Sequence, residues 1–152
     1  MKAINVFVAF TIAVISFTSC ATSKAITSYN ANNISKYSYV VFGNNNSGDR
    51  GLDDVMMAVQ NEIAQTRLQV LSSREGYVKI QEGKYVLSPN INITTEKWDG
   101  GHTYITITFY DYDTNQSVIV LKSSGIGLTI SQDQNIAIKA IRKELQKVFG
   151  EQ

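Results

Sequence analysis

Hydrophobic and polar residues alternate along three stretches in the second half of the chain, as expected of strands that bury one face. The stretch from Thr103 to Tyr112 alternates most strictly and places Ile105, Ile107 and Phe109 on one side. Turn-forming residues separate the stretches, so consecutive strands are predicted to pair as antiparallel hairpins. The three predicted strands cover residues 84–95, 103–112 and 117–127, with Gly125 and Gly127 marking the frayed end of the third.

Apolar residues at helical spacing predict two helices. The first begins at Asp53, and the second begins at a Ser131–Gln134 capping pattern and ends at Gly150, a residue type favoured after a helix C-terminus. The stripes consist of Val55, Met56, Val59 and Ile63 in the first helix, and Ala137, Ile138, Ile141, Leu145, Val148 and Phe149 in the second. Each stripe predicts that its helix packs on a sheet.

The remaining elements complete a fold class. YSYVVF at 37–42 is aromatic and β-branched, which predicts a strand. LQVLS at 68–72 fits either the last turn of the first helix or a short strand, and the alternation of Leu68 and Val70 favours the strand. The economical solution is an α+β two-layer sandwich, an antiparallel meander with two helices on one face. Residues 36–152 are predicted to form one such domain.

The first 19 residues have the layout of a signal peptide. Lys2 is their only charged residue, and an apolar run follows from Ala3 to Phe17. This run is shorter than the roughly 20 residues that a permanent transmembrane helix needs. No basic stop-transfer cluster follows it, so a cleaved leader is predicted.

Cys20 is the only cysteine of the chain and therefore has no intramolecular disulfide partner. Phe17-Thr18-Ser19-Cys20 resembles a bacterial lipobox of the looser Bacteroidetes type, with Phe17 where leucine is commoner. The resemblance implies that Cys20 is acylated and becomes the new N-terminus; an ordinary leader is the alternative. Polar residues 20–35 are then expected to form the lipidated N-terminus and a flexible tether.

The chain after the predicted leader also resembles a known class of proteins in its order of elements. From YVVF at 39–42 through HTYITITFYDYD at 102–113 to the final helix, it resembles small envelope lipoproteins of gut-type Gram-negative anaerobes. The order of elements is similar to accessory domains of outer-membrane assembly and secretion lipoproteins, a topological likeness that assigns no residue a role. Ala21 and Thr22, which follow Cys20, lack the aspartate that resembles an inner-membrane retention signal and the acidic run associated with export to the cell surface. The absence of both signals favours the periplasmic face of the outer membrane.

Charge excludes one class of partner. Without the leader, 13 basic residues balance 13 acidic ones. The densest basic group, around Arg142 and Lys143, falls on the exposed side of a predicted helix. A nucleic-acid partner is therefore not expected.

Catalytic and metal-binding sets are not recognisable. His102 is the only histidine and lacks companions for a metal site or a nucleophile–base pair. Residues 111–115 open like a calcium loop, but Gln116 and Lys122 stand where glycine and glutamate are needed. A small cell-wall hydrolase built on Asp111 and His102 remains a weak alternative. No catalytic residue, metal or cofactor is predicted.

Aromatic residues near the strictest strand are the candidate binding surface. Thr106 and Thr108 share a strand face with tyrosines, and this face points outward if Ile105 packs inward. Ordinary cross-strand packing would explain the same pattern. We expect a lipid-anchored, non-catalytic binding or assembly module with an envelope protein or glycan as partner; the alternative is a carbohydrate-binding lipoprotein. The candidate residues are Trp98, Tyr104, Tyr110 and Tyr112.

Overall fold

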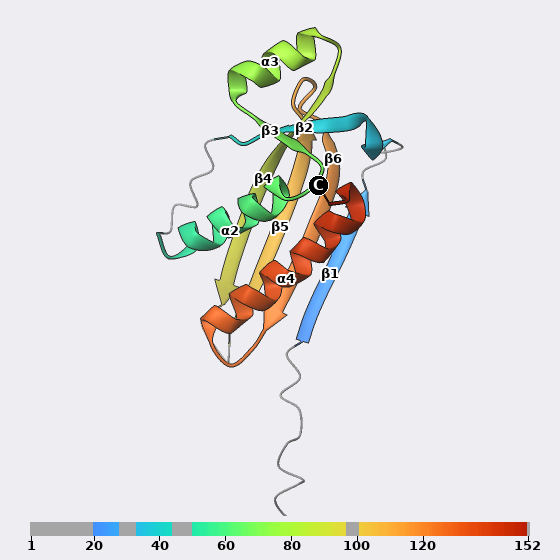
Figure 1. Cartoon of the computed structure of the whole chain (residues 1–152). Helices are drawn as coiled ribbons and strands as arrows, with labels where there is room; N and C mark the ends of the chain where they lie inside the picture. Colours follow the sequence, from blue (N-terminus) through green and yellow to red (C-terminus); the bar gives the residue numbers. More distant parts are fainter. Residues whose placement is uncertain (1–19, 28–32, 44–49, 97–100, 152) are drawn as a thin grey trace, which may run out of the picture.

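The computed structural model describes residues 20–27, 33–43, 50–96 and 101–151 and has an α+β fold. One six-stranded sheet has the order β1-β6-β5-β4-β2-β3, and α2 and α4 lie across one of its faces (Figure 1). The predicted fold class is therefore confirmed. The elements are β1 (Cys20–Thr27), η1 (Ile34–Lys36), β2 (Tyr37–Val41), η2 (Arg50–Leu52), α2 (Asp53–Ala64), β3 (Gln69–Leu71), α3 (Ser73–Gln81), β4 (Tyr85–Glu96), β5 (His102–Asp111), β6 (Ser117–Ile126) and α4 (Ile130–Phe149).

The central meander forms as the alternation predicts. β4, β5 and β6 pair antiparallel, with Ile107 opposite both Ile91 and Leu121. Ile105, Ile107 and Phe109 are fully buried beneath the helices. Because side chains alternate between the faces of a strand, the neighbouring threonines and tyrosines of β5 point to the opposite face.

The first strand is a departure from the predicted tether. Cys20–Thr27 form β1, which pairs antiparallel with β6 and places Cys20 opposite Ile126. Backbone pairing with an existing strand edge, rather than an apolar pattern, defines β1. Ser23 also donates a hydrogen bond to Oε1 of Glu144 on α4, at 2.9 Å. The tether prediction is therefore wrong for residues 20–27.

The sheet is mixed rather than purely antiparallel. β2 runs parallel to both of its neighbours, β4 and β3. β3 confirms the strand interpretation of residues 68–72. Parallel neighbours require a crossover, and α2 supplies the one between β2 and β3 while α3 lies between β3 and β4.

A third helix, α3, was not predicted. Its N-terminus is a capping box in which Ser72 Oγ accepts from the Glu75 amide at 3.3 Å and Glu75 Oε2 accepts from the Ser72 amide at 2.8 Å. α3 packs over a small cluster that includes Val41 and Val86. These residues alternate with members of the main core, so α3 lies on the sheet face opposite to α2 and α4.

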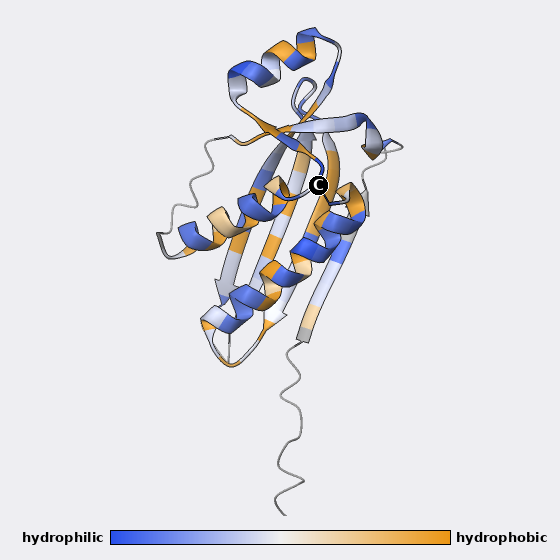
Figure 2. Ribbon diagram, viewed as in Figure 1, coloured by the Kyte–Doolittle hydropathy of each residue, from blue (hydrophilic) through white to orange (hydrophobic). Residues whose placement is uncertain are grey.

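The main core lies between the sheet and the helix pair. Apolar positions line the strands behind α2 and α4 (Figure 2). Phe109 and Phe149 meet edge to face with ring centroids 5.0 Å apart. Thr129, not the expected Ser131, caps α4, because its Oγ1 accepts from the Gln132 amide at 3.3 Å. α4 is thus fixed at its start by a cap and near its end by an aromatic pair.

Candidate functional site

The sheet face opposite to α2 and α4 is largely uncovered. α3 packs mainly on β2, β3 and β4 on that side, at one end of the sheet. Most of the rest carries short polar side chains, interrupted by tyrosine, lysine and the half-buried Val120. We call this surface the open face; its described residues include Thr22 and Lys24 of β1, Lys122 and Ser124 of β6, Tyr104, Thr106 and Thr108 of β5, and Asn90, Asn92 and Thr94 of β4.

Two lysines stand side by side on the open face. Lys24 and Lys122 are directly opposite each other in the pairing of β1 with β6, and both are exposed. Among the described residues neither forms a salt bridge. Like charges in directly opposed positions destabilise a strand pair, so an anionic or carbonyl-rich partner would relieve the repulsion. This pair was not predicted from the sequence, because the register depends on β1.

The predicted tyrosine platform is only partly present. Tyr104 is 41% exposed and stacks on His102 with ring centroids 6.0 Å apart. Tyr110 is half-buried. Tyr112 lies under α3, where its ring is 5.5 Å from that of Tyr77. The expectation that all three tyrosines share one exposed surface is therefore wrong for Tyr112.

Distance also separates the aromatic candidates. A strand rises about 3.3 Å per residue, so Tyr104 and Tyr112 are roughly 26 Å apart along the chain direction. The fourth candidate, Trp98, lies outside the described residues. The open face accordingly offers Tyr104 as a single exposed aromatic ring among amides and hydroxyls, rather than a row of rings.

His102 and Asp111 occupy opposite ends of β5. Their separation along the strand is about 30 Å at 3.3 Å per residue. His102 Nδ1 instead lies 3.7 Å from Glu96 Oε2 at the hairpin. Within the described ranges, no three His, Cys, Asp or Glu side chains converge as metal ligands. The structure therefore does not bring together the residues on which a hydrolase would depend.

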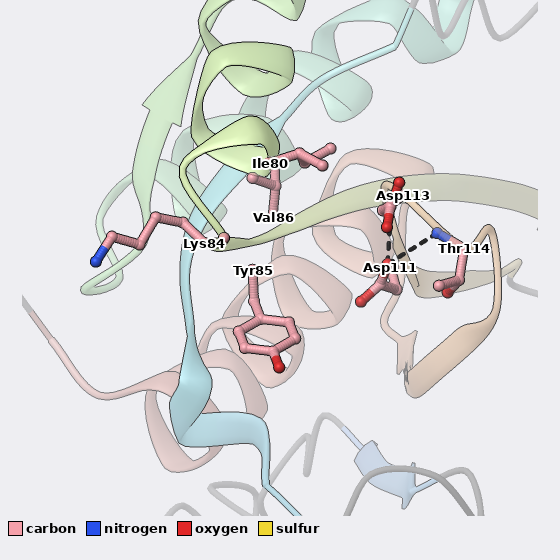
Figure 3. Close-up of a pocket in the computed structure, with 8 residues that line it drawn as sticks. Ile80, Lys84, Tyr85, Val86, Asp111, Asp113 and Thr114 are labelled. Atoms are coloured by element: carbon pink, nitrogen blue, oxygen red, sulfur yellow. Dashed lines mark hydrogen bonds between the residues drawn. The ribbon is translucent and has the colours of Figure 1, made fainter.

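Asp111 borders a shallow pocket of about 200 Å³ between α3, the start of β4 and the β5–β6 turn (Figure 3). Tyr37 donates its hydroxyl to Oδ2 at 2.8 Å, and the amides of Asp113 and Thr114 donate to Oδ1 at 3.1 and 3.0 Å. Lys84 extends away from the carboxylates. Oδ1 of Asp111 thus stabilises the β5–β6 turn, and Oδ2 binds the buried hydroxyl of Tyr37. The pocket is lined by Ile80, Gly83, Lys84, Tyr85, Val86, Asp111, Asp113 and Thr114.

These contacts shift two pKa values. Burial raises the pKa of Asp111, but hydrogen bonds from Thr114, Tyr37 and Asp113 outweigh it, so the pKa is lowered overall. Burial, followed by the bond to the Asp111 carboxylate, raises the pKa of Tyr37. Asp111 is therefore held ionised and Tyr37 protonated, as a structural pair requires.

Comparisons with known proteins bear on the fold. No protein-family model matches the chain, and no curated protein matches its sequence. A dodecamer of a single-substitution variant of PelC from Paraburkholderia phytofirmans is similar in structure, with a TM-score of 0.55 and 17% sequence identity. The match covers 87% of this chain and 100% of that chain. A second PelC dodecamer from this organism has a TM-score of 0.50 and 14% sequence identity, and the match covers 88% of this chain and 100% of that chain.

Both likenesses show the fold alone. They support the α+β architecture and assign no residue a role. Within the described ranges, no helix has both the length and the hydrophobicity needed to cross a bilayer.

Proposed function

We propose that this chain is a lipid-anchored protein of the cell envelope that works by binding, as a non-catalytic assembly module. The open face is the observation that carries this proposal. It extends over four strands, presents amides, hydroxyls and two adjacent lysines, and is covered by α3 only at one end. A flat polar surface of this kind suits contact with another macromolecule better than enclosure of a small substrate.

Acylation of Cys20 would attach the domain to the membrane. Cys20 is both the last residue of the lipobox-like segment and the first residue of β1, so cleavage before it removes no described residue. Two or more acyl chains, each adding about 0.8 kcal/mol per buried methylene, hold a protein stably on a bilayer. The periplasmic face of the outer membrane is the location we propose.

Self-assembly is one form that binding could take. The two similar PelC structures are dodecamers, and the chain shares their fold over their whole length. This supports a second copy of the chain as one partner of the module.

Substitution of Cys20 tests the anchor. In a Gram-negative host, the wild-type chain is expected to begin at Cys20, carry the mass of its acyl chains and sediment with membranes. The Cys20→Ala variant is expected to be absent from the membrane fraction. Intact-mass measurement and membrane fractionation are the readouts. Thr22→Ala, which keeps the thiol, is the matched control and should behave as wild type. An unmodified thiol in a soluble wild-type protein would refute the anchor.

Glycan binding is the second candidate, favoured by the exposed ring of Tyr104 beside Asn and Thr side chains. Calorimetric titration with envelope and dietary glycans should then detect binding by the wild-type chain. Tyr104→Ala should weaken the affinity by roughly two- to tenfold, since stacking on one aromatic ring contributes about 0.5–1.5 kcal/mol. Tyr77→Ala, an exposed tyrosine of α3 away from Tyr104, is the control. Absence of heat for the wild-type chain would eliminate this candidate.

A further inference from the structure

An apolar surface lies at the end of the domain where β1 begins. It consists of Ile126, the last residue of β6, Leu128 in the following loop and Ile130, the first residue of α4. Their side chains are 36%, 66% and 44% exposed. We call these three residues the apolar tip. The chain from Ser124 to Gln132 contains no charged residue. Glu96 and His102 of the neighbouring hairpin lie at the same end of the sheet and border the tip.

The apolar tip lies beside the proposed attachment point. Cys20 is the direct partner of Ile126, and paired Cα atoms of antiparallel strands are about 5 Å apart. Leu128 follows two residues later, within about 7 Å of Ile126. Because Cys20 belongs to a paired strand, no flexible tether separates an acyl chain on it from the tip. An acyl chain on Cys20 would therefore enter the membrane close to these apolar side chains.

Two backbone amides of the loop have partners within the protein. The Gly127 amide donates to Oδ1 of Asp133, and the Leu128 amide donates to Oε1 of Gln132 at 3.0 Å. Asp133 is itself fully buried. An amide without a partner is costly in an apolar medium. These two side chains remove that cost for the part of the loop that carries Leu128.

We propose that the apolar tip docks into the interfacial region of the bilayer that holds the Cys20 lipid. This inference rests on the proposed function for the anchor and deepens it, because it fixes how the domain meets the membrane. Apolar side chains of peripheral proteins penetrate about 5–10 Å into this region. With the tip as the membrane contact, the strands stand away from the bilayer, α3 lies at the distal end, and the open face is turned sideways toward a partner (Figure 1).

Single-cysteine labelling tests the docking in the full chain. Acylation consumes the thiol of Cys20, the only cysteine, so an introduced cysteine is the sole reactive site. Leu128→Cys and Ile130→Cys each receive a nitrobenzoxadiazole probe, and the lipidated proteins are reconstituted in phosphatidylethanolamine–phosphatidylglycerol vesicles. Matched controls are Met57→Cys on α2 and Tyr77→Cys on α3, which are 61% and 63% exposed in the wild type. All four positions are exposed, and circular dichroism of each labelled variant confirms that it is folded; Tyr77→Cys also removes the ring contact with Tyr112.

Collisional quenchers attached to lipid acyl chains report contact with the bilayer. Probes at 128 and 130 are expected to shift to shorter emission wavelengths and lose most of their emission to the lipid quencher, while probes at 57 and 77 respond only to aqueous iodide. Iodide quenching at all four positions, without lipid quenching, overturns the inference. Shielding of 128 and 130 from both quenchers also overturns it, because a protein surface then covers the tip.

Intact mass of the same samples separates the two proposals. If the chain carries lipid on Cys20 but shows no lipid quenching at the tip, the docking proposal is refuted and the anchor proposal is supported. If the mass shows no lipid on Cys20, its free thiol would also take the probe, so the four variants are then remade in a Cys20→Ala background. Lipid quenching at 128 and 130 of that background, and not at 57 and 77, refutes the anchor and supports the docking.

Discussion

Replacing Gly125 by alanine is expected to lower the melting temperature of the protein by about 10 °C. An ideal Cβ at this position would lie 2.2 Å from the carbonyl oxygen of Asp133 and 2.6 Å from the amide nitrogen of Ala137, both backbone atoms of α4. Backbone cannot yield as a flexible side chain does, so β6 and α4 must separate. Overpacking typically costs 1–3 kcal/mol, and we expect about 4 kcal/mol here, at about 2–4 °C per kcal/mol.

Gly83→Ala is the control that separates crowding from backbone strain. Gly83 has φ +73° and no heavy atom within 4 Å of an added Cβ, so its substitution should cost only about 1–2 kcal/mol for left-handed backbone. Gly125 is not in the left-handed region, and its cost arises from α4 alone. Thermal and urea unfolding followed by circular dichroism measures both. A Gly125→Ala variant no less stable than Gly83→Ala would show that α4 does not approach β6 this closely.

The role of Gly125 in packing could not be predicted from the alternation of β6. Alternation along β4, β5 and β6 predicts their pairing and buried face, because burying one side of a sheet requires period two. The same pattern suggested a frayed end at Gly125 and Gly127. In the structure Gly125 is buried, and its missing side chain lets the helix approach. Packing between layers, not local propensity, decides this residue type.

Two elements escaped prediction for different physical reasons. The sequence ATSKAIT at 21–27 has no clear apolar period, because an edge strand gains its stability from hydrogen bonds to β6. α3 is short and has Gly76 at its centre, so it has little apolar stripe. Its capping box, SSRE at 72–75, was a readable signal for the helix start.

The same omissions limited the prediction of the binding surface. The alternation of β5 correctly placed Tyr104 on the face away from the main core. Tyr112 shares that face but is covered by α3, which no pattern in β5 could reveal. The pairing of Lys24 with Lys122, and of Cys20 with Ile126, depends on the register of β1. Long-range register is a tertiary property, so these parts of the surface became visible only in the structure.

Replacing Asp111 by alanine is expected to cost about 3 kcal/mol of folding stability at pH 7. The substitution leaves the buried hydroxyl of Tyr37 without its acceptor and removes the acceptor of the Asp113 and Thr114 amides. A hydrogen bond to a charged group contributes about 1.5–3 kcal/mol, and a buried donor left unsatisfied adds its desolvation cost. Urea unfolding at pH 7 measures the difference from wild type.

The pH dependence of Asp111→Asn gives a sharper test of the ionised carboxylate. The pKa of Asp111 is lowered in the folded protein, so its contribution is present above the unfolded value of about 3.9 and is lost as pH falls through the folded pKa. Asparagine keeps an acceptor for the turn but has no charge to lose. The stability difference between wild type and Asp111→Asn should therefore be largest at neutral pH and shrink below about pH 4.

Asp113→Asn provides the matched control. Asp113 is exposed, and its amide rather than its carboxylate bonds to Asp111. The substitution keeps that bond and should change stability by less than about 0.5 kcal/mol at any pH. If Asp111→Asn instead differs from wild type by the same amount at pH 7 and pH 3, the Tyr37 hydroxyl bonds equally well to a neutral group. The role of the Asp111 charge would then have to lie at the pocket surface rather than in the fold.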